Sequence, residues 1–393
     1  MRKKYCVILA LGFCLALAVG GCKNLVCDWS GAKYQRIVLC QAPLEADSTL
    51  VAETKSGSIS VAGGDVADCN VIATICVRAA TEQQAQEIAE QVEIQLERAD
   101  KTLTVKAREP AEKSKCAISI SYNITVPRQT NIECTSLYGA IKIANISGNA
   151  TGKTGSGSIT AENIEGSAQL NTSYGSIACK DVSGENIRLK SGSGKITAEN
   201  IKGSAQIDTN YGSITCKDFS GGNIRLKSGS GEIKLLKASF GDCDVRTSYG
   251  SIVSDEVTGK LVKLGSGSGN ITATKSSATT TNVSASYGSI TCREIISDEL
   301  TAETKSGNID ITCSESAPAG IAANVVTSYG SINFVAPPNF SGQVEVVTNY
   351  GSIRNELVMT TTTEVSKKKV MGAVGAGKGM LRLQTAGGSI KIK

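Results

Sequence analysis

The side chains of this sequence that could do chemistry are carboxylates, tyrosines and cysteines that recur with a short repeat. The chain contains no histidine, which excludes a histidine-activated nucleophile and a histidine metal site. A carboxylate pair, or a Lys or Arg base with a bound cation, is the remaining catalytic option. The acidic residues of the repeats, such as Glu162 and Glu199, recur with the repeat and do not converge at one place. The sequence therefore predicts a protein that is not an enzyme, with no catalytic residue, no cofactor and no metal site.

Three positions before the repeat isoleucine, tyrosine and serine alternate strictly from Tyr138 to Ser306, and Tyr329 and Tyr350 follow. The candidate binding ladder consists of Tyr138, Tyr174, Tyr211, Tyr249, Tyr287, Tyr329 and Tyr350. Regularly spaced rings can pack against sugar rings or partner side chains. The simpler interpretation is packing, in which each ring covers the Ser-Gly corner of the adjacent repeat.

Charged side chains form a second set of repeating positions. The candidate charged ladder consists of Arg188, Lys190, Arg225 and Lys227, and a further set consists of Lys180-Asp181, Lys217-Asp218 and Arg293-Glu294. Mixed charges at regular spacing are typical of a solvated face that keeps a protein soluble. The alternative is a second binding surface.

The elements that position these residues are short strands repeated at a nearly fixed period. A glycine followed two residues later by isoleucine recurs twelve times from Ile141 to Ile353, mostly in steps of 18 or 19 residues. Such a period indicates a coil of strands stacked on itself, a mainly β fold of the single-chain β-solenoid (β-helix) class with rungs of about 19 residues. The glycine is expected at a tight corner that requires positive φ.

Near-identical copies support growth of the repeat by duplication. Residues 154–190 and 191–227 are identical at 28 of 37 positions. Two positions after the repeat isoleucine lies a column of mostly small apolar residues on the same strand face. Cys179, Cys216 and Cys292 belong to this column, so they are expected to be interior residues and not metal or redox sites.

The segments on either side of the repeat have a different texture. Residues 36–136 predict a small α+β cap over the N-terminal edge of the solenoid, with one helix over residues 82–99. Thr81 and Gln84 form the capping box of that helix. The solenoid itself is expected over residues 137–354.

The C-terminal segment departs from the period and then returns to it. Residues 355–380 contain three consecutive lysines and a glycine-rich stretch without the spacing of a phosphate-binding loop, so an irregular, mobile loop is expected. Residues 381–393 end in TAGGSIKIK, where Gly388 and Ile390 repeat the rung pattern. This segment predicts a terminal rung that seals the stack.

The N-terminal residues 1–21 predict a cleaved signal, because Arg2, Lys3 and Lys4 precede an apolar run too short for a stable membrane span. The stretch Val19-Gly20-Gly21-Cys22 resembles the lipobox of bacterial lipoproteins, which implies acylation of Cys22 and a membrane partner through the lipid. Residues 22–35 would form a linker. Removing the signal takes three positive charges from the formal +5 and leaves +2, a balance that argues against a nucleic-acid partner.

The run SYNITVPR from Ser121, the rungs TSLYGAIKI and SGSGSITAENIEG, and the closing GGSIKIK together carry a family resemblance. The sequence resembles the bacterial putative-adhesin β-strand-repeat family, which is related to the head domain of putative autotransporter adhesins. The likeness covers roughly residues 45–393 and rests on degenerate motifs. It implies a β-solenoid fold and an envelope location, and it brings no catalytic residues.

The function expected from these features is non-catalytic. The chain is interpreted as an exported cell-envelope lipoprotein, at the outer membrane or cell surface, that displays its solenoid for adhesion or for binding a polysaccharide or an envelope protein. Two alternatives stay open: a carbohydrate-active β-helix enzyme, and a structural envelope protein that self-assembles. The sequence leaves the oligomeric state and the disulfide pairing undecided.

Overall fold

The computed structural model describes residues 31–110 and 116–393. The fold is mainly β, a β-solenoid of about 11 turns, which confirms the expected fold class. The chain divides between Thr172 and Ser173 into two compact units, called unit 1 and unit 2 below. The expected signal sequence, Cys22 and most of the linker lie outside the described residues. No helix in the described ranges is long and apolar enough to cross a membrane.

A rung consists of two short strands, one in each of two facing sheets, joined by a tight corner. Side chains alternate along each strand, so every second residue points between the sheets. In the strand from Ile196, for example, Ile196 and Ala198 are buried and Thr197 between them is partly exposed. The core is therefore mainly a stack of Ile, Val, Leu, Ala and Cys side chains, with a few aromatic rings such as Phe219 and Phe334, which agrees with a composition that is only 4% aromatic.

The first sheet of unit 1 contains six strands among the described residues. Their spatial order is β5 (Glu93–Ala99), β6 (Thr102–Arg108), β2 (Thr49–Thr54), β8 (Asn131–Ser136), β10 (Ala150–Thr154) and β12 (Ala168–Thr172). All neighbours are parallel except β5 and β6, which form an antiparallel hairpin.

The second sheet of unit 1 also contains six strands in the part of the chain that the structure describes. Their spatial order is β1 (Ala32–Pro43), β4 (Asp68–Ala79), β7 (Ala117–Pro127), β3 (Ile59–Gly64), β9 (Ile141–Ile146) and β11 (Ile159–Ile164). The pairs β1–β4 and β4–β7 are antiparallel, and the pairs from β7 to β11 are parallel. Strands β2 and β3 thus form a rung that lies earlier in the sequence than the expected start at residue 137.

The helix of unit 1 is shorter than expected, because α1 spans Glu82–Gln91. Thr81 caps it as predicted, since its Oγ1 accepts a hydrogen bond from the Gln84 amide at 3.2 Å. The remainder of the expected helix forms β5. Its Leu96 fits the helical stripe, but Leu96 together with Ile94 also fits a strand period of two, and antiparallel pairing with β6 decides between the two.

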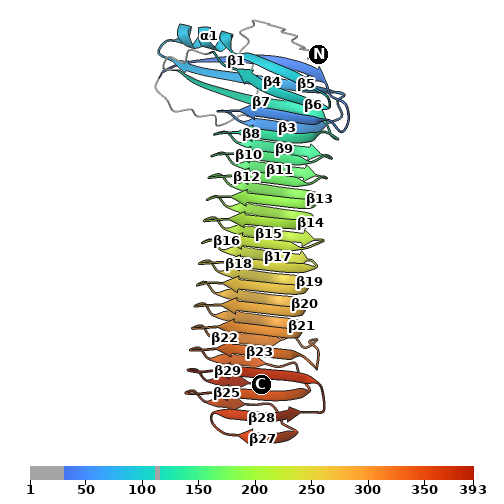
Figure 1. The fold of residues 1–393 in the computed structure, drawn as a ribbon, viewed down its shortest axis with the longest axis vertical. Helices are drawn as coiled ribbons and strands as arrows, with labels where there is room; N and C mark the ends of the chain where they lie inside the picture. Colours follow the sequence, from blue (N-terminus) through green and yellow to red (C-terminus); the bar gives the residue numbers. More distant parts are fainter. Residues whose placement is uncertain (1–30, 111–115) are drawn as a thin grey trace. The chain divides into compact units, whose positions relative to one another are not determined.

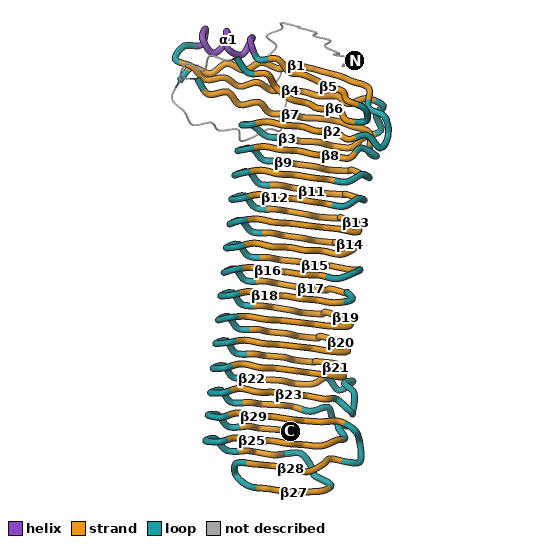
Figure 2. The backbone as a smooth tube through the Cα atoms, viewed as in Figure 1, coloured by secondary structure: helices purple, strands orange, loops and turns teal. Residues whose placement is uncertain are grey.

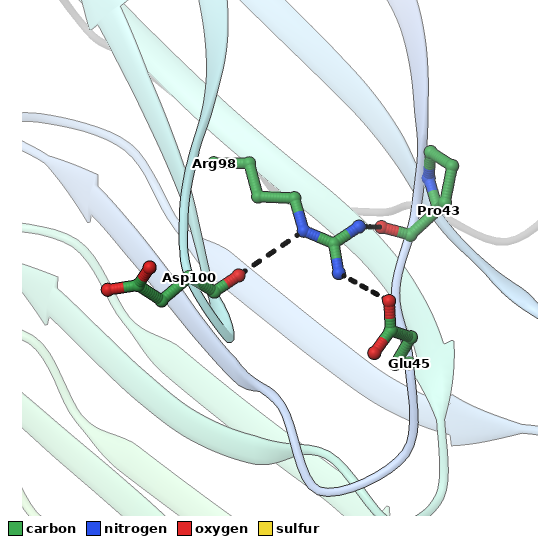
Figure 3. A network of polar contacts seen from close by, with 4 residues as sticks. All are labelled: Pro43, Glu45, Arg98 and Asp100. Atoms are coloured by element: carbon green, nitrogen blue, oxygen red, sulfur yellow. Dashed lines mark hydrogen bonds and ion pairs between the residues drawn. The ribbon is translucent and has the colours of Figure 1, made fainter. Parts of the chain in front are cut away.

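Two arginines tie the helix and the hairpin to the rest of unit 1. Arg36 Nη1 on β1 donates to the carbonyl oxygens of Ala89 at 2.9 Å and Val92 at 3.1 Å, at the end of α1, where a cation satisfies the last carbonyls of a helix. Arg98 on β5 contacts the backbone of Pro43 and the Glu45 carboxylate, at 3.3 and 3.0 Å (Figure 3).

The first sheet of unit 2 stacks its strands in parallel until its last two members. Their spatial order is the second half of β13 (Ile177–Ser191), the second half of β14 (Ile196–Thr209), β16 (Ile224–Ser228), β18 (Asp242–Thr247), the second halves of β19 (Ile252–Ser266), β20 (Ile271–Ala285) and β21 (Ile290–Thr304), then β23 (Ala322–Thr327), β29 (Gly379–Thr385), β25 (Gly342–Thr348), and the antiparallel β28 (Lys369–Val374) and β27 (Thr361–Val365).

The second sheet of unit 2 is parallel throughout (Figure 1). It contains the first halves of β13, β14, β19, β20 and β21, together with β15 (Ile214–Ser220), β17 (Ile233–Ser239), β22 (Ile309–Cys313), β24 (Ile332–Val335), β30 (Ile390–Ile392) and β26 (Ile353–Asn355). Figure 2 shows the corners between the strands as short loops.

The C-terminal segment of unit 2 differs from two sequence predictions. Residues 381–393, expected as the terminal rung, form an inner rung: β29 pairs with both β23 and β25, and β30 pairs with both β24 and β26. Residues 355–380, expected as a loop, contain β27 and β28. After β24 the chain forms the outer rung of β25 and β26, turns back through the hairpin of β27 and β28, and then inserts β29 and β30 between the outer rung and the rung of β23 and β24. Strand β28 of the hairpin pairs with β25 and covers its edge.

The repeat glycines are required for a reason other than the expected one. None of the twelve from Gly139 to Gly351 is among the positive-φ glycines of the described residues, so that expectation is wrong. A Cβ on Gly212 would lie 1.9 Å from the carbonyl oxygen of Gly194 on the previous rung. At this corner the main chains of successive rungs are in direct contact, and only a residue without a side chain allows this approach.

Positive φ occurs instead at the other corner of the rung, four positions after the repeat isoleucine. Nine non-glycine residues there have φ between 50° and 59°: Asn145, Asn163, Asp181, Asn200, Asp218, Lys237, Glu256, Lys275 and Glu294. Five of the nine are Asn or Asp, which tolerate the left-handed conformation best. This column turns the chain from the second sheet of one rung to the first sheet of the next.

Candidate functional site

The corner that carries the tyrosines is held by a buried hydroxyl two residues before nearly every Tyr or Ser. Thr209 Oγ1 accepts from the Gly212 amide at 3.1 Å and donates to the Gly194 carbonyl of the previous rung at 3.3 Å. Ser228 makes the same pair of bonds one rung later, to Gly231 and Gly212. These hydroxyls form a ladder that ties a corner to the one before it.

The backbone of the corner is the same whether the exposed residue is tyrosine or serine. The Tyr211 amide donates to the Gly192 carbonyl at 3.2 Å, and the Ser230 amide donates to the Asn210 carbonyl at 3.1 Å. The main chain therefore fixes this position without help from its side chain. The side chain is left to point outward.

All seven tyrosines of the candidate ladder are exposed, with exposed fractions from 65% to 83%. None of their hydroxyls has a hydrogen-bond partner among residues 31–110 and 116–393. This exposure argues against the packing interpretation, because a ring that lay flat on a neighbouring corner would have one of its two faces buried. Isolated exposed apolar residues are common, but a regular row of exposed rings is a feature that requires an explanation.

In unit 2 the tyrosines occupy every second rung of the stack, although two of them lie on rungs that are consecutive in the sequence. Tyr329 and Tyr350 stand on successive rungs of the sequence, without a serine rung between them. In the first sheet, β29 lies between their strands, and the corner after β29 carries Gly387 at the tyrosine position. A tyrosine thus stands on every second rung from Tyr174 to Tyr350, at intervals of about 9.6 Å.

The surface around the rings of unit 2 consists of small polar residues. Ser248 precedes Tyr249, and Ser251 follows Gly250. The other tyrosine corners have the same composition, with Ser or Asn before the ring and Ser two residues after it. Rings that rise from hydroxyl and amide groups present flat apolar faces together with hydrogen-bonding groups, a combination suited to a ligand with the same mixture.

The candidate charged ladder lies on the outer face of the first sheet of unit 2. Arg188, Lys190, Arg225 and Lys227 are all exposed. Gln206 stands in register between the two arginines, and Asp208 between the two lysines. On the second sheet, Lys180, Glu199 and Lys217 follow one another in register. The solvated-face interpretation fits these three rungs of the second sheet, where positive and negative charges alternate.

Two shallow hollows open on the outer face of the first sheet of unit 2. One, of about 380 Å³, lies along the row of Arg188, Gln206, Arg225 and Asp244. The other, of about 580 Å³, lies nearer the tyrosine corner, and its lining includes Ser248 and Ser286, the residues directly before Tyr249 and Tyr287. The tyrosine row and a hollow with charged walls are therefore neighbours.

The cysteines of the repeat lie in the core, as predicted. Cys179, Cys216 and Cys292 are buried and free, and burial raises the pKa of each thiol to about 12. A thiol in this state is a poor nucleophile and a poor metal ligand. No three Cys, Asp or Glu side chains in the described part of the chain lie close enough to share a metal ion.

Sequence reasoning missed two parts of the corner. The first is the rung of β2 and β3, whose KSGSISV at residues 55–61 has the same Ser-Gly-x-Ile pattern as KSGNIDI at 305–311. The second is the hydroxyl ladder, whose signal is a Ser or Thr two residues before nearly every ladder position. Ala285 is the exception within the repeat.

One comparison with known proteins identifies a family. The sequence profile of a family described as Toastrack DUF4097 matches residues 59–238 and 217–393, which is more than half of the chain. No curated protein sequence matches this chain.

Three solved structures are similar to the chain, all at low identity. A putative cell adhesion protein from Clostridium sporogenes is 11% identical, with 92% of this chain and 99% of that chain covered and a TM-score of 0.17. A putative adhesin from Bacteroides fragilis is 12% identical, with 91% and 97% covered and a TM-score of 0.24. A putative adhesin from Parabacteroides merdae is 12% identical, with 72% and 97% covered and a TM-score of 0.28.

Proposed function

The chain belongs to the Toastrack DUF4097 family, and from this premise we propose that it is a non-catalytic binding protein of the bacterial cell envelope. Its ligand is an extended polysaccharide, held along the tyrosine ladder of unit 2. The observation that carries the proposal is the row of exposed rings on alternate rungs, from Tyr174 to Tyr350. A ligand that repeats along its length matches a surface that repeats along a solenoid.

The chemistry of the ladder favours sugars over other polymers. A sugar ring has an apolar face of C–H groups and a rim of hydroxyls, so it can stack on an aromatic ring while bonding to hydroxyl and amide groups beside it. The tyrosine corners offer both, since Ser or Asn flanks each ring. Because the rings are already exposed and their backbone is fixed, binding costs little ordering.

The distribution of carboxylates supports a non-catalytic role. A glycosidase needs two carboxyl groups about 5 to 10 Å apart around one bond. Glu199, an acidic residue of the repeat, stands in register between Lys180 and Lys217, and Lys217 Nζ lies 3.7 Å from its carboxylate. A carboxylate paired in this way is a member of a surface charge row.

The envelope location is proposed from residues 1–22 alone. A basic start, a short apolar run and Cys22 after two small residues support export and lipid attachment. The test is metabolic labelling with a fatty-acid analogue, followed by fractionation. Cys22→Ser should abolish the label and release the protein from the membrane fraction, and a labelled, membrane-bound Cys22→Ser variant would exclude the proposal.

The ladder is tested with residues 23–393 as a soluble protein and an array of extended glycans. In one variant Tyr211, Tyr249 and Tyr287 are changed to Ser, the residue that the intervening rungs already carry, so the fold should be retained. A matched variant carries Phe at the same positions and keeps the rings. We expect the Ser variant to lose binding and the Phe variant to keep most of it.

Three other outcomes would count against the proposal. Equal binding by a folded Ser variant would place the ligand elsewhere, and release of shortened glycan would favour the enzyme. Growth of the particle with concentration would favour self-assembly.

A further inference from the structure

The hollow beside Tyr249 and Tyr287 forms where two small residues occupy a column of outward positions that carries long side chains on earlier rungs. The outward position next to the tyrosine corner carries Lys227, Arg246, Gly265 and Ser284 on successive rungs. The hollow of about 580 Å³ opens where Gly265 and Ser284 replace long side chains.

Packing does not require a glycine at position 265. A Cβ there would meet only Ser284 Oγ at 3.5 Å and the Arg246 side chain at 3.8 Å, which is ordinary contact. The repeat glycines at the corners, in contrast, face backbone at about 2 Å. The absence of a side chain at Gly265 therefore leaves accessible space that the fold itself does not demand.

The walls of the hollow are positively charged. Lys227, Arg246 and Lys263 line it together with Asp244, and Asp244 is neutralised by Arg246, whose Nε lies 2.7 Å from its carboxylate. Lys227 and Lys263 are exposed, and neither has an ion pair within the described residues. Two ammonium groups are thus available to an anion.

This charge is concentrated in one part of the first sheet. On the two outward positions nearest the tyrosine corner, the five rungs from Arg188 to Gly265 carry six basic and two acidic side chains: Arg188, Lys190, Arg225, Lys227, Arg246 and Lys263 against Asp208 and Asp244. The same positions on the next three rungs carry Asn282, Ser284, Thr301, Glu303, Asn324 and Val326. An anionic ligand would therefore be held at a defined place along the ladder.

We propose that the ligand is an acidic polysaccharide with a disaccharide repeat, and that the hollow binds a carboxylate of one repeat through Lys227 and Lys263. The inference rests on the proposed function of the ladder. Two rungs measure about 9.6 Å, close to the length of an extended disaccharide, so every second sugar meets a ring at Tyr211, Tyr249 and Tyr287. The carboxylate at the hollow then sets the register of the chain through charge-assisted hydrogen bonds.

The test compares four probes on the soluble chain by calorimetry. They are hyaluronan oligosaccharides, in which a uronic acid alternates with an N-acetylated sugar, the same oligosaccharides with their carboxyl groups reduced, neutral chito-oligosaccharides, and polyglutamate. The acidic oligosaccharide should bind at least about tenfold more tightly than its reduced form. The difference should shrink as the salt concentration rises, because exposed charges are screened.

Two variants locate the effect at the hollow. Lys227→Gln with Lys263→Gln should abolish the preference for the acidic form, and Gly265→Gln should do the same by filling the space without strain. The control is Lys180→Gln with Lys202→Gln, which removes two exposed lysines of the second sheet and should leave the preference unchanged.

The outcomes separate the inference from the function it rests on. If neutral and acidic glycans bind equally and both depend on the tyrosines, the ladder is a glycan surface and the inference is overturned. If polyglutamate binds as well as the acidic glycan, the site recognises charge alone and the inference is overturned too. If binding does not depend on the tyrosines at all, both the proposed function and the inference are overturned.

Discussion

Tyr329 and Tyr350 stand on rungs that succeed each other in the sequence but do not touch in the sheet. Strand β29, which comes from the C-terminus of the chain, pairs with β23 on one side and β25 on the other. The insertion places the two rings two rungs apart, as the other rings of unit 2 are. The periodic surface therefore depends on a strand order that breaks the sequence order.

Cysteine pairs test that order directly. Val326 and Val347 each face Gln384 in register, from opposite sides. Val326→Cys with Gln384→Cys should form a disulfide on mild oxidation, because neighbouring strands lie about 4.8 Å apart. Val326→Cys with Val347→Cys should not, since about 9.6 Å separates them. Peptide mass spectrometry under non-reducing conditions reads out both, and crosslinking of the second pair alone would contradict the observed order.

The hydroxyl ladder has a gap at Ala285, where the neighbouring rungs carry Ser266 and Thr304. Ala285→Thr should stabilise unit 2 by about 1 kcal/mol, since the new hydroxyl can accept from the Gly288 amide and donate to the Gly269 carbonyl. Thr209→Ala should destabilise it by about 1 to 2 kcal/mol, because two buried backbone groups lose a partner. Urea unfolding measures both, and a loss of stability in Ala285→Thr would show that the gap is needed for packing.

The column of residues with positive φ, four positions after the repeat isoleucine, predicts different effects on stability for two substitutions at one position. Lys237 has φ of 54°, so Lys237→Asn should be neutral or slightly stabilising, while the β-branched Lys237→Val should cost about 1 to 2 kcal/mol. Lys142 is an exposed residue of extended strand β9, where valine is the better residue. If Lys142→Val and Lys237→Val have equal effects on the urea midpoint, backbone conformation does not explain the column.

The sequence predicts the repeating part of this fold because each rung carries its own signal. The Gly-x-Ile period, the interior column of Cys179, Cys216 and Cys292, and the alternation of tyrosine are local patterns, and all three are found in the structure. The rung that contains Ile59 has the same signal but lies apart from the regular series, since about 80 residues separate it from Ile141. Its pairing with β9 is visible only in the sheet.

What sequence reasoning got wrong depends on non-local contacts. The end of α1 is decided by the pairing of β5 with β6, and the place of β29 by its fit between β23 and β25. The reason for the corner glycines is likewise a contact, since the oxygen that excludes a side chain at Gly212 belongs to Gly194 on another rung. The charged hollow follows from Gly265 and Ser284 standing side by side, although they are 19 residues apart.

The buried thiols predict a loss of stability at alkaline pH. Burial raises the pKa of Cys216 from 9.0 to about 12, so above pH 9 the unfolded chain releases a proton that the folded chain keeps. The contribution of the neutral thiol is therefore complete below pH 9 and declines as the pH rises toward 12, by about 1.4 kcal/mol per unit for each thiol. Cys179 and Cys292 act in the same direction.

Urea unfolding at pH 7.5 and 10.5 tests this effect with Cys216→Ala. The free energy of unfolding should fall less between the two pH values in this variant than in the unchanged chain. Alanine is chosen because Ala198 and Ala273 already occupy this column. An equal loss in both proteins would mean that other groups cause the alkaline instability.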